Sequence, residues 1–277
     1  MLKTILGGIA VGIANIIPGV SGGTMMVILG IFDPLMAAIN DFLKIKSENR
    51  IKDLIYILQV LIGAAIGLIG FANVIEFLFG NYYVPTMYWF IGLVVCSIPV
   101  LLKNEMKGCK LNAVYLVIGI LVIVAMYYFS PEKGDVVITE FPPISIARMI
   151  KLVGVGCISG ATMILPGVSG SMMMLIIGEY YYFKSYLANV LTFQLNILIP
   201  LCFLGIGIVL GIILSAKITS YCLKNYRAQT MSLILGLIIA SSVVLIPTSG
   251  YSLSVILMSL VAFVIGGGIV LGIDKLS

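Results

Sequence analysis

The sequence of 277 residues contains no histidine, which removes the commonest general base and the ligands of HExxH-type zinc sites. Charged residues make up only 10% of the chain, against about 25% in soluble globular domains. The five cysteines form no CxxC pair, so they indicate small core residues rather than metal ligands. A net charge of +5 is too small to indicate nucleic-acid binding. We therefore expect no enzyme, no metal site and no cofactor.

What the chain has in abundance is apolar sequence, with 61% hydrophobic residues and a mean hydropathy of +1.20. Such a chain cannot cover its surface with polar groups, so the bilayer must be its solvent. The composition predicts one all-α integral membrane domain over residues 1–277. Its apolar segments are 2–43, 54–80, 84–102, 111–129, 148–183, 189–216, 228–247 and 252–273.

An internal duplication divides the chain. Residues 3–30 align with 151–178 at 13 identical positions out of 28, including PGVSG in both copies. A second block, around Gly92-Leu93 and Gly236-Leu237, follows at nearly the same offset. We therefore assign repeat one to 1–130, a linker to 131–145 and repeat two to 146–277.

The PGVSG motifs predict re-entrant helical hairpins over 2–43 and 148–183, because proline and glycine interrupt a helix. The alternative is that each segment crosses the membrane twice. Either arrangement returns the chain to the side from which it entered, so the topology of the other spans is the same. Three spans in each half then give an inverted-topology repeat. With both termini cytoplasmic, the inner side would hold twelve lysines and arginines and the outer side four, as the positive-inside rule requires.

Inverted repeats with broken helices are typical of secondary transporters. The start of the second half-helix in each hairpin offers free N–H groups, hydroxyls and small residues, a suitable cradle for a phosphate. Packing of one hairpin against the other is the alternative use of such residues. The cradle residues are Ser21, Gly22, Gly23, Thr24, Ser169, Gly170 and Ser171, with Asn15 and Thr162 as secondary polar contacts.

Charged residues near the second hairpin have two interpretations. Arg148 and Lys151 are placed to capture a phosphate head group from the outer leaflet, or to anchor the interface by snorkelling. Glu76, Glu179 and Asp33 lie in apolar surroundings, where a carboxylate is costly. They are therefore candidates for proton or sodium coupling, unless they face water near a span's end.

The doubled PGVSG hairpins and the Gly-Leu-x-x-x-Ser span in each half resemble the PopT family of bacterial polyprenyl-phosphate transporters, over essentially the whole chain. The resemblance implies a bacterial plasma-membrane protein that returns undecaprenyl phosphate from the outer to the cytoplasmic leaflet for cell-envelope synthesis. It implies a head-group region at Ser21 to Thr24 and Ser169 to Ser171. The copies differ, because Met172 stands where the first copy has Thr24.

Three other classes of function are weighed against this one. The same half-helix chemistry would suit a transporter of small soluble anions. A lipid phosphatase or transferase would need a nucleophile with a base, or clustered carboxylates, and the sequence offers neither. A purely structural partner would have no use for the Ser-Gly motifs.

Overall fold

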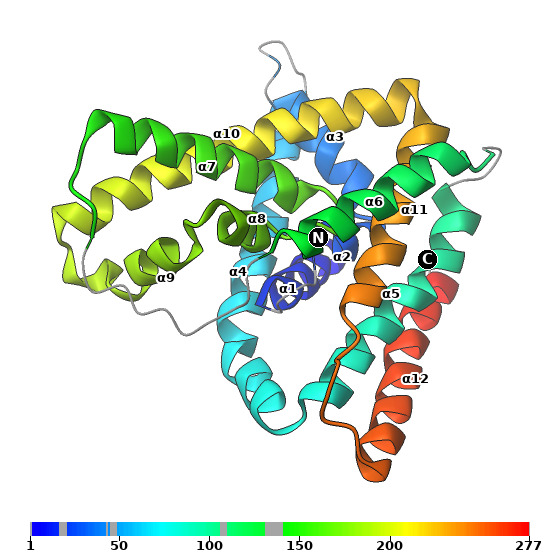
Figure 1. Cartoon of the computed structure of the whole chain (residues 1–277). Helices are drawn as coiled ribbons and strands as arrows, with labels where there is room; N and C mark the ends of the chain where they lie inside the picture. Colours follow the sequence, from blue (N-terminus) through cyan, green and yellow to red (C-terminus); the bar gives the residue numbers. More distant parts are fainter. Residues whose placement is uncertain are drawn as a thin grey trace.

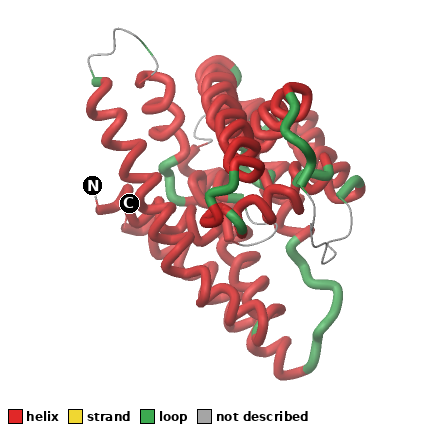
Figure 2. The backbone as a smooth tube through the Cα atoms, turned by 90° about the vertical axis from the view of Figure 1, so that its left-hand side faces the viewer, coloured by secondary structure: helices red, strands yellow, loops and turns green. Residues whose placement is uncertain are grey.

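The computed structural model describes residues 2–16, 21–42, 44, 49–105, 110–130 and 141–276, and every regular element within them is a helix (Figures 1 and 2). The all-α prediction is confirmed. The helices of the first half are α1 (Leu2–Ile16), α2 (Gly22–Ile28), α3 (Phe32–Phe42), α4 (Arg50–Asn81), α5 (Tyr83–Glu105) and α6 (Ala113–Tyr128). Those of the second half are α7 (Ile146–Ile164), α8 (Gly170–Ile177), α9 (Tyr180–Ala188), the 3₁₀ turn η1 (Val190–Thr192), α10 (Leu195–Asn225), α11 (Arg227–Val244) and α12 (Leu253–Leu276).

Six of these helices are long and apolar enough to cross a membrane: α4, α5, α7, α10, α11 and α12. The short helices α2 and α3 meet at 109°, and this bent pair could add a seventh span. Helix α6 has only 16 residues, fewer than the ~20 of a usual span, whereas α7 is long enough by itself. The division into re-entrant hairpins and three spans per half stays a prediction.

The spans differ in what surrounds them. About half of α5 and of α11 is buried, 56% of each span, whereas only 22% of the α12 span is buried. Large apolar side chains such as Ile69 and Leu253 are about three-quarters exposed. Since such surface is unfavourable in water, α4 and α12 present it to lipid, while α5 and α11 form the core.

Glycines bring the helices of each half into backbone contact. A Cβ added at Gly160 would lie 2.1 Å from the carbonyl oxygen of Ile208, so α7 and α10 touch directly. Helices α1 and α4 meet in the same way, with Gly12 against Ala64. Close approach of this kind is how helices associate in lipid, where the hydrophobic effect contributes little. The glycines with such contacts are Gly8, Gly12, Gly63 and Gly67 in the first half and Gly156, Gly160, Gly207 and Gly211 in the second.

The remaining long helices pair across the two halves. Helix α12 packs along α5, where Gly92 faces the backbone of Phe263 (Figure 1). Helix α6 packs along α11, where Gly236 faces the backbone of Leu116. The last helix of each half, α6 or α12, therefore packs against a core helix of the other half, α11 or α5.

Candidate functional site

The first PGVSG motif is described from Ser21 onward, because residues 17–20 lie outside the described part of the chain. Ser21 is the N-cap of α2, and its hydroxyl accepts a hydrogen bond from the Gly23 amide at 3.2 Å. This is the usual way in which a serine satisfies a free amide at a helix start. Ser21 is 3% exposed, and Gly22, Gly23 and Thr24 are also buried.

The backbone of the second motif covers these residues. The Ser21 hydroxyl donates to the carbonyl oxygen of Leu165 at 3.2 Å, and the Gly167 amide donates to Oγ1 of Thr24 at 2.7 Å. A Cβ on Gly23 would lie 2.7 Å from the Ile164 carbonyl oxygen. In this conformation the first motif therefore packs against the second and has no room for a ligand.

The second motif is more open. Helix α7 ends at Ile164, and Gly167 adopts a φ of 84°, which favours glycine. Ser169 is the N-cap of α8 but makes no capping bond; its hydroxyl lies 2.8 Å from that of Ser171, which is exposed. Gly170 is buried against Met163 and the carbonyl oxygen of Ser159. The hydroxyls of this copy remain accessible to a ligand.

The secondary polar residues lie beside the two motifs. The Asn15 side chain would be 2.8 Å from a Cβ on Gly22, so it adjoins the start of α2. Thr162 donates from its hydroxyl to the carbonyl oxygen of Ser159 at 2.8 Å, a bond within its own helix. Asn15 is exposed, so of the two it is the one with a side chain open to a ligand.

Arg148, Lys151 and Glu179 form one ion cluster. Both terminal nitrogens of Arg148 donate to the Glu179 carboxylate, each at 2.6 Å, and Nζ of Lys151 lies 2.7 Å from Oε1. The Glu179 side chain is 3% exposed, that of Arg148 12% and that of Lys151 54%. The predicted phosphate ligands and the predicted coupling carboxylate therefore share a site, which carries a net charge of about +1.

Glu179 lies between α8 and α9, outside the candidate spans. Burial alone would raise its pKa, but hydrogen bonds from Arg148 and Lys151 outweigh this effect and lower the pKa below its ordinary value. The carboxylate is therefore ionised at neutral pH in this conformation. A coupling role for it would require Arg148 to move away.

Two tyrosines of α9 complete the surroundings of Arg148. The guanidinium carbon lies 5.2 Å from the centre of the Tyr182 ring, a cation–π contact. Tyr186 is 1% exposed, lies beside Arg148 and stacks on Phe141 at 5.0 Å between ring centres. Within the described residues, neither the Tyr186 hydroxyl nor Nε of Arg148 has a hydrogen-bond partner of regular geometry. Both are buried polar groups that lie close to each other and are incompletely satisfied.

The ion cluster and the open hydroxyls are separate. Ser169 precedes α8 and Glu179 follows it, and eight helical residues span ~12 Å. The predicted phosphate ligands therefore form two groups at the two ends of α8 rather than one cradle. Sequence reasoning overlooked Tyr186, although its i, i+4 spacing from Tyr182 on α9 indicates a shared helix face.

The other two coupling candidates are less informative. Asp33 lies in the first turn of α3, with Oδ2 3.6 Å from Nη1 of Arg227, and both side chains are about 40% exposed. Its role in coupling stays a prediction. The side chain of Glu76 lies outside the described residues.

Comparisons with known proteins agree with each other. The undecaprenyl phosphate translocase-like family matches residues 11–262. A polyprenyl-phosphate transporter of Staphylococcus aureus is 29% identical over 265 residues, covering 95% of this chain and 92% of its own. A polyprenyl-phosphate transporter of Vibrio cholerae is 30% identical over 250 residues, covering 87% of this chain and 76% of its own. No solved structure matches.

Proposed function

The chain belongs to the undecaprenyl phosphate translocase-like family, and from this premise we propose that it carries undecaprenyl phosphate from the outer to the cytoplasmic leaflet of the bacterial plasma membrane. Its multiple apolar helices make it a multi-pass membrane protein. The related chains are named transporters, so the proposal contains no chemical step on the lipid. The single observation that supports the head-group position is the buried, incompletely paired Arg148.

The phosphate would bind at the groups of the ion cluster that are still free. Nε of Arg148 and the Tyr186 hydroxyl adjoin each other without a hydrogen bond of regular geometry, and half-exposed Lys151 adds a positive charge. A phosphate monoester carries about −1.5 to −2 charges near neutral pH. Because the cluster has a net charge of about +1, it attracts the head group without holding it as tightly as two unpaired cations would.

Glu179 in this proposal is a built-in competitor for the phosphate. Its carboxylate occupies both terminal nitrogens of Arg148, the geometry that a phosphate would otherwise take. Removing its charge leaves Arg148 and Lys151 without an internal anion. The Glu179→Gln variant should therefore bind the phosphate more tightly and release it more slowly.

The contact between the two PGVSG motifs supports an alternating-access step. Hydrogen bonds from Ser21 and to Thr24 close the first motif against the second, while Ser169 and Ser171 stay open. We place the outward-facing position at the second motif and expect the first to open when this contact breaks. Moving one negative charge inward against a 100 mV inside-negative potential costs about 2.3 kcal/mol, so proton or sodium coupling belongs to the proposal.

The experiment is binding of undecaprenyl phosphate to the purified chain, measured by native mass spectrometry against undecaprenol. Lys151→Gln is the test variant, because this exposed residue can be changed without leaving a cavity. Lys184→Gln, an exposed lysine on α9 with no contact to Glu179 in the described residues, is the matched control. We expect a preference for the phosphate that weakens in the first variant only. Equal binding of lipid phosphate and alcohol would refute the site and favour a small soluble anion as substrate.

A further inference from the structure

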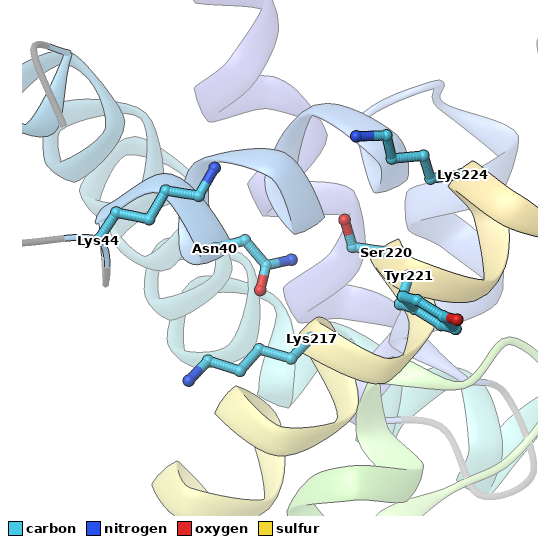
Figure 3. A pocket seen from close by; sticks show the side chains of 6 residues that line it. All are labelled: Asn40, Lys44, Lys217, Ser220, Tyr221 and Lys224. Atoms are coloured by element: carbon cyan, nitrogen blue, oxygen red, sulfur yellow. The ribbon is translucent and has the colours of Figure 1, made fainter. Parts of the chain in front are cut away.

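A cationic cavity lies between α3 and α10 (Figure 3). Its volume is about 350 Å³. The residues that line it are Asn40, Lys44, Lys217, Ser220, Tyr221 and Lys224. None of them belongs to the ion cluster around Arg148.

One face of α10 supplies most of this cavity. Lys217, Ser220, Tyr221 and Lys224 follow at i, i+3, i+4 and i+7, which places them along the same side of the helix. Asn40 joins the two walls, because its Nδ2 donates to the carbonyl oxygen of Ala216 at 3.1 Å. The walls of the cavity are therefore fixed relative to each other.

The charge of the cavity is close to the opposite of a phosphate monoester's. Lys44 is paired with Asp41 at 2.5 Å, whereas within the described residues no carboxylate lies within salt-bridge distance of Lys217 or Lys224. The net charge is thus about +2, against −1.5 to −2 for the monoester. In Figure 3 the amines of Lys44 and Lys224 extend toward each other above Asn40 and Ser220, whereas the amine of Lys217 extends away from them, on the other side of Asn40.

The cavity and the Arg148 cluster lie at opposite ends of one helix pair. Helices α7 and α10 run in parallel, with Gly156 against Gly207, so Arg148 is level with a point about eight residues before Gly207. Lys217 lies ten residues after Gly207, which makes a separation of ~27 Å at 1.5 Å per residue. This is close to the ~30 Å thickness of the hydrocarbon core.

We propose that this cavity binds a phosphate monoester on the cytoplasmic side, as the position from which the transported head group leaves the protein. The proposal rests on the proposed function for its direction, but the binding itself does not. The ligand chemistry is shared by a lipid head group and by inorganic phosphate. Lysines that served only as topology signals would need no cavity with polar walls between two helices.

The test is native mass spectrometry of the full chain with undecaprenyl phosphate, undecaprenol and inorganic phosphate as separate probes. The test variant is Lys217→Gln/Lys224→Gln. Lys52→Gln/Lys110→Gln is the matched control, because it removes two exposed lysines. The positive-inside rule predicts these two for the cytoplasmic side, together with Lys44, Lys217 and Lys224. Each lysine near an anionic lipid contributes about a factor of five, so the first variant should weaken one of two phosphate sites by roughly 25-fold. Ser220→Asp, which adds a negative charge between the lysines, should have the same effect.

The outcomes separate the two sites and the two ligand sources. Loss of one lipid phosphate in the Lys217/Lys224 variant, with the other retained, supports the cavity. Inorganic phosphate bound with the same dependence, in the absence of lipid phosphate at this site, identifies soluble phosphate as the ligand, and lipid phosphate bound there identifies the lipid head group. Unchanged phosphate binding in both cavity variants overturns the inference, even where Lys151→Gln still weakens binding. Weaker phosphate binding in the cavity variants, with unchanged binding in Lys151→Gln, would refute the head-group position at Arg148 and support the cavity.

Discussion

The bond between Arg148 and Glu179 predicts strong energetic coupling between two residues 31 positions apart. We consider Arg148→Gln, Glu179→Gln and the double variant. Removing one partner of a buried ion pair costs about 3–5 kcal/mol, because the remaining charge stays buried. In Arg148→Gln, Lys151 still pairs with Glu179 and compensates part of its charge, although its 54% exposure makes this pair weak. We therefore expect a loss at the lower end of the range, about 3 kcal/mol.

Thermal unfolding of the purified chain in detergent measures this effect. A change of 1 kcal/mol shifts the Tm by about 2–4 °C in chains of 150–250 residues, so Arg148→Gln should lower it by roughly 6–12 °C. The double variant should lose less than the sum of the single losses, because it leaves no buried charge unpaired. Lys184→Gln serves as the control and should leave the Tm unchanged. Additive losses would show that the two side chains do not stabilise each other and would refute the reasoning.

Backbone contact and ionisation give two more predictions. Gly160→Ala should force α7 and α10 apart and cost about 1–3 kcal/mol, measured as a lower Tm, since its Cβ would lie 2.1 Å from the Ile208 carbonyl oxygen. Gly154→Ala, which meets nothing within 4 Å, is the matched control, and equal losses in both would contradict the close packing. The lowered pKa of Glu179 means that its ion pair stabilises the fold fully above the ordinary value of 4.5 and less as pH falls below it. The Tm advantage of wild type over Glu179→Gln should therefore shrink below about pH 4.5, and an advantage independent of pH would contradict this linkage.

The apolar segments could be predicted from the sequence because their signal is local. The segments at 54–80 and 84–102 became α4 and α5 with ends shifted by a few residues. Proline and glycine in PGVSG likewise predicted the breaks between α7 and α8. Each of these predictions depends on neighbouring residues alone, so it needs no knowledge of the rest of the chain.

The two copies of the motif could not be told apart in this way. Ser21 and Ser169 occupy equivalent positions in nearly identical sequence, yet one is sealed and the other is half-buried. The difference comes from Leu165 and Gly167, whose backbone groups bond to the first copy from the other half of the chain. Accessibility is a property of what packs on a residue, and that partner lies more than 140 positions away.

The sequence alone thus indicated membrane insertion, the duplication and the family, because hydropathy, the identical residues of the two copies and the PGVSG motifs are all properties of the sequence. Only the tertiary structure joined Glu179 to Arg148, and only it placed Lys44, which follows α3, in one cavity with Lys217 of α10. The first depends on the length and direction of α8, and the second on how two helices from different halves pack. The effect of a charged residue depends on the groups around it, and helix packing, not distance along the sequence, determines which groups these are.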